Sequence, residues 1–200
     1  MLKFYYAPRT ISVAVAIVLE QQGIAHEAVR VDFASAEQAS YDYLQINPKG
    51  RVPTIETPHG ILTETPAILE YIAADLVPED AFAAAKMREM MSYLNATMHP
   101  HHAHGLRGAR WADQQSSFDD MKQKVPQRMG DCAAYLEQFL PALPFEAGTM
   151  AVLSDAYLYV VLTWLSGDGV DIADYPRLAA FQHKMNTHAS VQSVYAKGML

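Results

Sequence analysis

The stretch from Asn47 to Tyr71 constrains the fold of this chain more than any other part of it. It begins with Asn-Pro-Lys-Gly, which is typical of a tight turn, and a second turn follows at Pro58-His59-Gly60. The short apolar runs after these turns, at 52–57 and 61–63, predict two strands. Glu64-Thr65-Pro66 then combines a polar cap with a proline in the first helical turn. The stretch therefore predicts a hairpin that leads directly into a helix.

Composition sets the broad class of the protein. The chain has 200 residues, half of them hydrophobic, which is enough for one domain or two small ones. Its net charge of −7 argues against nucleic acid and against an anionic membrane surface as partners. The single cysteine, Cys132, excludes a disulfide framework. No apolar run reaches the roughly 18 residues of a membrane span and the N-terminus does not resemble a signal peptide, so we expect a cytoplasmic protein.

Strand and helix signals alternate up to the hairpin and its helix, and only helix signals follow. Before the hairpin, the pattern predicts strands at 2–6 and 26–33, a helix at 11–22 and a weak helix at 34–46. A linker covers 75–80. After it we expect helices at 81–99, within 111–140 (started or interrupted at Pro126), at 154–165 and at 175–194, with a loop at 141–148. The fold class is therefore α/β in the first part, in the order βαβα then ββα, and all-α in the second.

Two motifs in the hairpin stretch resemble the glutathione transferase family. Asn-Pro-x-Gly-x-Val-Pro at 47–53 is followed by Glu-Thr-x-Ala-Ile-x-x-Tyr-Ile at 64–72, as in the glutathione-binding half of that family. KFYY at 3–6 and AYLYVVLTW at 156–164 are most similar to bacterial, beta-class-like members. The resemblance covers nearly the whole chain.

The resemblance implies a thioredoxin-like N-terminal domain at 1–76 (βαβαββα) and an all-helical C-terminal domain at 81–200. Asp155 matches an aspartate motif that is structural in the family, although Val152 stands at the position of the usual Ser or Thr cap. A homodimer, a role in detoxification and glutathione as co-substrate, with no metal, are further implications. Apolar residues on the long helix exceed what one core needs and are either interface or core residues: Met87, Met90, Met91 and Leu94.

The same resemblance implies how glutathione is held. The peptide bond between Val52 and Pro53 would be cis, and the backbone of Val52 would pair with the cysteinyl unit. Glu64 would bind the ammonium of the γ-glutamyl group, and Thr65 its carboxylate, at a helix N-terminus.

A lysine that often holds the glycine carboxylate in this family has no counterpart here. It follows the second strand, where this chain has Phe33-Ala34-Ser35-Ala36-Glu37. Lys49 and Arg51 lie nearby in the sequence and could substitute for it.

Activation of the thiol requires a group that favours the thiolate. Beta-class enzymes carry a cysteine and then a serine between the first strand and the first helix, and this chain has Ile11 and Ser12 there. Ser12 is therefore the first candidate for a hydrogen bond to the thiolate, followed by Thr10 and Tyr6. His99 matches a histidine that lies beside the sulfur in beta-class proteins.

Four histidines gather within six residues, at His99, His101, His102 and His104. Imidazole binds zinc, copper and nickel, so a metal site is one interpretation. Pro100 is expected to break the helix geometry, and no carboxylate or cysteine lies close in sequence, so a solvent-facing helix end is the other. The residues that follow could line the mouth of a cleft: Arg107, Arg110 and Trp111.

Three functions fit these observations. The first is an enzyme that conjugates glutathione to a small apolar electrophile. The second is a non-catalytic protein of the same fold that binds glutathione or a hydrophobic ligand. The third is a glutathione-dependent isomerase or reductase. A dithiol oxidoreductase is excluded, because the chain has no Cys-x-x-Cys. We predict the first.

Overall fold

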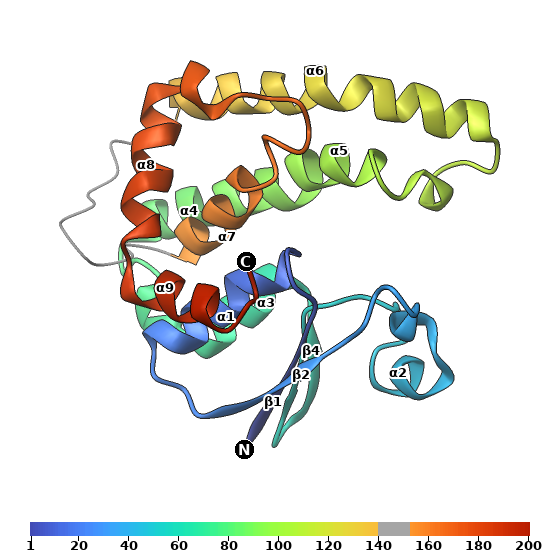
Figure 1. The fold of residues 1–200 in the computed structure, drawn as a ribbon. Helices are drawn as coiled ribbons and strands as arrows, with labels where there is room; N and C mark the ends of the chain where they lie inside the picture. Colours follow the sequence, from blue (N-terminus) through green and yellow to red (C-terminus); the bar gives the residue numbers. More distant parts are fainter. Residues whose placement is uncertain (140–152) are drawn as a thin grey trace.

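The computed structural model describes residues 1–139 and 153–200. A four-stranded sheet in the order β2-β1-β3-β4 forms one end of the molecule (Figure 1). Its strands are β1 (Leu2–Tyr6), β2 (His26–Arg30), β3 (Thr54–Thr57) and β4 (Gly60–Thr63). β1 runs parallel to β2 and antiparallel to β3, and β3 and β4 form the expected hairpin.

Helices cover both faces of this sheet. They are α1 (Ser12–Gln21), α2 (Tyr41–Ile46) and α3 (Thr65–Ile72). Neighbouring residues of a strand point to opposite faces, so Phe4 enters the main core with α1 and α3. Tyr5, on the other face, packs with Tyr43 of α2 and with Val31 in a small second cluster.

The second part of the described chain is helical and has no strand. Its α-helices are α4 (Ala81–Tyr93), α5 (His99–His104), α6 (Gln115–Phe139), α7 (Leu153–Leu162), α8 (Pro176–Asn186) and α9 (Ala189–Ala196). A π-helical segment, Leu94–Met98, joins α4 to α5. Short 3-10 turns lie at Glu37–Ala39, Ala74–Leu76, Gly108–Arg110 and Ile172–Asp174.

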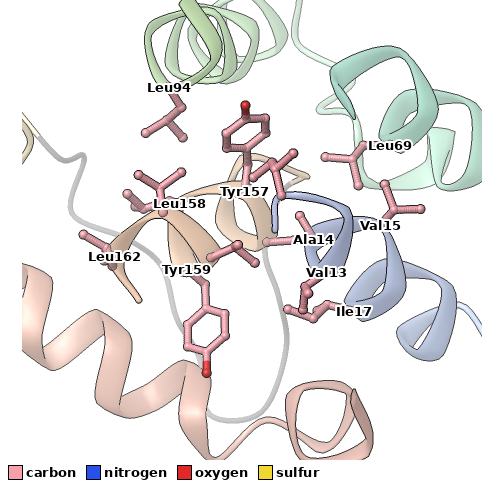
Figure 2. Packing of buried hydrophobic residues seen from close by; sticks show 14 of the residues in the cluster. Val13, Ala14, Val15, Ile17, Leu69, Leu94, Tyr157, Leu158, Tyr159 and Leu162 are labelled. Carbon is pink, nitrogen blue, oxygen red and sulfur yellow. The ribbon is translucent and has the colours of Figure 1, made fainter. Parts of the chain in front are cut away.

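Helix α7 lies at the centre of the core, and all ten of its residues are buried. It packs against α1, α4 and α8, while α9 packs against α1 (Figure 1). Figure 2 shows side chains of α1, among them Val13 and Ile17, close to α7, with Leu69 and Leu94 approaching from other helices. One hydrophobic cluster therefore runs from the sheet into the helical part.

The predicted fold class is confirmed, a mixed sheet with helices followed by a helical part, and the Val52–Pro53 bond is cis. Because the core is continuous, the domain limits 1–76 and 81–200 stay a proposal. The loop expected at 141–148 and the cap position Val152 lie outside the described residues.

Two prolines behave differently from the sequence prediction. Helix α6 neither starts nor stops at Pro126 but runs through it. Buried Val125 and Met129 anchor the helix on both sides, which offsets the one backbone hydrogen bond that proline removes. At Pro100 the helix also continues, because the wider π-helical turn just before it removes the clash that an α-helical turn would create.

Candidate active site

A cleft of about 370 Å³ lies between the loop after β1 and helix α5. One wall is formed by residues 8–11, Phe33 and residues 51–52. The other is formed by Asn95, one face of α5, the connection at 106–111 and Trp164. Four of the site residues predicted from the sequence line this cleft: Thr10, Arg51, Val52 and His99. Arg107, Arg110 and Trp111 line the cleft as expected.

The loop after β1 is held by hydroxyl groups. Ser12 is fully buried, and its Oγ accepts the N–H of Ala7 at 3.1 Å and lies 3.0 Å from the Ala7 carbonyl oxygen. Thr10 Oγ1 lies 2.7 Å from Ser12 Oγ and donates to the same carbonyl at 2.8 Å. Ser12 therefore braces the loop from inside, whereas Thr10 also borders the cleft.

The same loop is tied to the end of the chain. The indole N–H of Trp164 donates to the Arg9 carbonyl at 3.2 Å, and the Arg9 N–H donates to the Met199 carbonyl at 2.9 Å. The position of Thr10 beside the cleft thus depends on residues more than 150 positions away in sequence. Tyr6 lies away from this cleft wall, because its ring stacks on Phe4 against the core.

His99 belongs to a hydrogen-bonded chain. Tyr157 donates its hydroxyl proton to Asn95 Oδ1 at 3.2 Å, and its Oη lies 3.1 Å from His99 Nδ1. Since the Tyr157 proton is already used, His99 donates through Nδ1 and keeps Nε2 as an acceptor. Burial lowers the pKa of His99 to about 4, with help from the charges of His102 and nearby arginines. His99 is therefore a neutral base at pH 7.

His102 forms a second polar contact at this wall. Its Nδ1 lies 2.8 Å from Asp168 Oδ2, and its ring stacks on Trp164 with a centroid distance of 4.2 Å. A larger cavity of about 1070 Å³ lies beyond these two rings and shares Arg9 and Leu106 with the cleft. No local sequence pattern predicts the partner Asp168, which lies 66 residues away.

Val52 and Pro53 precede β3, which begins at Thr54 and not at Val52 as predicted. Nothing in the described chain hydrogen-bonds the N–H or C=O of Val52, so both are available to a ligand. The neighbouring Arg51 carbonyl is fixed by the amide of buried Asn47 at 2.7 Å and by the hydroxyl of Tyr43 at 2.8 Å. These two supporting residues were not among the predicted site residues.

Glu64 and Thr65 lie at the N-terminus of α3. Glu64 is exposed, has a positive φ of 72°, and pairs with Lys49, which also donates to Thr63 at 2.6 Å. Thr65 is buried. Neither residue borders the 370 Å³ cleft, so the cleft does not include the predicted γ-glutamyl site. The described residues contain no group of three or more metal-ligating side chains. Nor is any described helix long and apolar enough to cross a membrane.

Comparison with known proteins agrees with this architecture. Residues 1–74 match the glutathione S-transferase N-terminal domain. A glutathione transferase homologue from Sulfitobacter, solved with bound glutathione, is 52% identical, with a TM-score of 0.95 over 100% of this chain and 99% of the other. A bacterial beta-class glutathione S-transferase from Sphingomonas chungbukensis is 28% identical, with a TM-score of 0.82 over 99% and 100% of the two chains.

A relative of known sequence also matches this chain over its full length. Glutathione S-transferase GST-4.5 of Xanthomonas campestris pv. campestris is 29% identical over 99% of this chain and 100% of its own. A thioredoxin-like sheet followed by a helical part, with a cleft between them, is the architecture of a glutathione transferase. The chain belongs to the glutathione S-transferase family, with beta-class proteins among its structural neighbours.

Proposed function

We propose that this protein transfers glutathione to a small electrophile. The supporting observation is that one cleft of a glutathione transferase fold gathers the free backbone of Val52, the hydroxyl of Thr10 and the neutral imidazole of His99. In this proposal Val52 pairs with the cysteinyl unit, while Glu64 and Thr65 hold the γ-glutamyl group.

The reaction needs a thiolate near Thr10 and His99. Bound glutathione releases its thiol proton to solvent, and the Thr10 hydroxyl donates a hydrogen bond to the resulting sulfur anion. His99 lies beside the sulfur as a neutral imidazole, because a group with a pKa of about 4 does not hold a thiol proton at pH 7. The sulfur then forms a bond to the electrophilic carbon, and the leaving group departs with its electron pair. Ser12, the first candidate from the sequence, stays a prediction. We favour Thr10, because the Ser12 hydroxyl is fully buried and occupied by Ala7.

The finer expectations also belong to this proposal. Leu106, Trp111 and Trp164 give the cleft an apolar wall for the carbon skeleton of the electrophile. We propose a homodimer that acts in detoxification in the cytoplasm, where a lone buried thiol such as Cys132 stays reduced. Residues 1–76 and 81–200 would be its two domains.

Binding and turnover are tested separately. Calorimetry measures glutathione affinity, and absorbance follows conjugation to a dinitrophenyl chloride. We expect both in the parent chain. Glu64→Gln removes a charge-assisted hydrogen bond of about 1.5–3 kcal/mol, so affinity should fall on the order of ten- to a hundredfold.

Glu70→Gln is the matched control. Glu70 lies on the same helix and pairs with Arg88 instead. Equal affinity of Glu64→Gln and the parent would contradict the placement of the γ-glutamyl site. Glutathione binding without turnover would favour a non-catalytic binding protein.

A further inference from the structure

The cleft concentrates positive charge in an acidic protein. The chain carries a net charge of −7, yet Arg51, Arg107 and Arg110 all line this one cleft, with Arg9 at its edge. No aspartate or glutamate of the described chain lines it. An unbalanced set of cations at a concave surface raises the local concentration of anionic ligands.

These three arginines have no acidic partner within the described residues. Two other arginines are paired with acidic side chains, Arg88 with Glu70 and Arg128 with Asp131. Burial and the charge of Arg51 lower the pKa of Arg107. Burial and the charges of Arg107 and Arg51 lower that of Arg110 to about 10. Guanidinium groups are cations, so the three side chains repel one another, and an anion bound between them would relieve this repulsion.

Arg107 is also held in position. Its guanidinium lies 5.1 Å from the centre of the Phe33 ring, across the cleft from the connection that carries Arg107. Such stacking orients the planar group and leaves its edge N–H donors available. A guanidinium edge matches the two oxygens of a carboxylate and binds them through parallel hydrogen bonds.

We infer that Arg51, Arg107 and Arg110 form a subsite for a carboxylate on the electrophilic substrate. This inference rests on the proposed function, and it narrows the substrate class to acidic electrophiles. Leu106 and Trp111, on the same connection as Arg107 and Arg110, contact the carbon skeleton, while the arginines bind the acidic group. The electrophile is then apolar over most of its skeleton but anionic at one end.

Glutathione also carries carboxylates, and its glycine carboxylate is the competing occupant. Arg107 and Arg110 line the helical wall of the cleft, whereas Val52, where the cysteinyl unit is proposed to bind, lines the other wall. This position favours the second substrate as the source of the anion.

The test compares two substrates that differ only in charge. They are an aryl chloride activated by two nitro groups and bearing a para carboxylate, and the matching carboxamide. For each variant the ratio of kcat/KM for the carboxylate to kcat/KM for the carboxamide is compared with that of the parent, so intrinsic reactivity cancels. We expect this ratio to fall on the order of tenfold in Arg107→Gln and in Arg110→Gln. Arg128→Gln, at an exposed position of α6 outside the cleft, should leave the ratio unchanged.

A second set of measurements distinguishes the carboxylate of the electrophile from the glycine carboxylate of glutathione. Affinity for glutathione and for its glycine ethyl ester is measured by calorimetry. If the arginine variants lose the preference for free glutathione over the ester but keep the substrate ratio, the subsite serves glycine and the inference is overturned. An unchanged substrate ratio in both arginine variants also overturns it.

Failure of the proposed function gives a different result. A parent chain that binds no glutathione and conjugates neither aryl chloride contradicts the transferase proposal itself. Arg110 lies at the surface of the cleft and makes no ring contact within the described chain like that of Arg107 with Phe33, so Arg110→Gln should fold even if loss of the Phe33 contact unfolds Arg107→Gln.

Discussion

At the scale of residues, a single proton position decides what His99 can do. Burial raises the pKa of Tyr157, so its hydroxyl keeps its proton and donates it to Asn95. The imidazole must then donate through Nδ1 to Tyr157, and Nε2 carries a lone pair. Because the low pKa keeps the ring neutral, His99 does not act as a fixed cation beside a thiolate.

The low pKa of His99 makes stability depend on pH. The unfolded chain binds a proton at His99 near 6.5, whereas the folded chain binds it only near 4. The contribution of neutral His99 to the free energy of unfolding is thus complete above pH 6.5, and it is lost as the pH falls toward 4. At about pH 5 the loss should be on the order of 2 kcal/mol.

Urea unfolding at about pH 7 and about pH 5 checks this expectation, because it gives the free energy of unfolding at each pH. His99→Gln should lose less stability between the two pH values than the parent. His183→Gln, on an exposed part of α8, should behave like the parent. If His99→Gln keeps the full acid sensitivity of the parent, the imidazole is not held neutral by burial.

Removal of the two hydroxyls of the β1–α1 loop should have different effects, on stability for Ser12 and on conjugation for Thr10. Ser12→Ala leaves the buried Ala7 N–H without a partner and should cost about 1–3 kcal/mol of stability. Thr10→Val should slow conjugation on the order of tenfold and raise the pKa of bound glutathione, because a donor to the thiolate is lost. Thr10→Ser, which keeps the hydroxyl, is the control.

Thiolate absorbance against pH and urea unfolding distinguish these effects. A raised thiol pKa in Ser12→Ala with unchanged stability would restore Ser12 as the thiolate donor. If Thr10→Val changes neither the pKa of the bound thiol nor the free energy of unfolding, Thr10 does not have the proposed role.

At the scale of elements, local sequence signals predicted most of the helices and strands. Turn chemistry at Asn47 and Gly60 and the proline after Thr65 predicted the hairpin and α3, because these signals act within a few residues. The π-helical segment before Pro100 was missed, since it adapts the turn to packing that the sequence does not show locally.

The candidate site was less predictable because long-range contacts assemble it. The loop with Thr10 could be located from the alternation of strand and helix. That Ser12 turns inward, and that His102 finds Asp168, depends on the tertiary fold. Arg107 opposite Phe33 joins residues 74 positions apart in the sequence, and no local spacing predicts such a contact.

The turn after α7 is expected to hold α5 in place through His102 and Asp168. The Asp168 side chain is only 8% exposed and accepts a hydrogen bond from His102. Asp168→Asn weakens this charged acceptor and should cost about 1–2 kcal/mol of stability, measured by urea unfolding. Exposed Asp174→Asn is the control. Equal midpoints for Asp168→Asn and the parent would show that the pair does not hold α5.

At the scale of the whole molecule, the sheet and the helices share one core, so the cleft walls are rigid relative to each other. Helix α7 contacts α1 on one side and α4 and α8 on the other. Met87, Met91 and Leu94, three of the four interface candidates from the sequence, are buried in the core of this chain, and the fourth, Met90, is partly buried against it. Their burial removes the simplest sequence argument for a dimer, so a dimer must use other side chains.

The expected homodimer should depend on aromatic side chains that the single chain leaves uncovered. Phe82, at the start of α4, is 75% exposed, although most large apolar side chains nearby are buried. Covering it against a second copy would stabilise the pair by about 1.5–3 kcal/mol.

Light scattering at micromolar concentration should give twice the 22.2 kDa of one chain. Phe82→Ser should shift the mass toward one chain, whereas Tyr41→Ser, at an equally exposed ring on α2, should not. A parent mass near 22.2 kDa would contradict the dimer, and a dimer unaffected by Phe82→Ser would place its interface elsewhere.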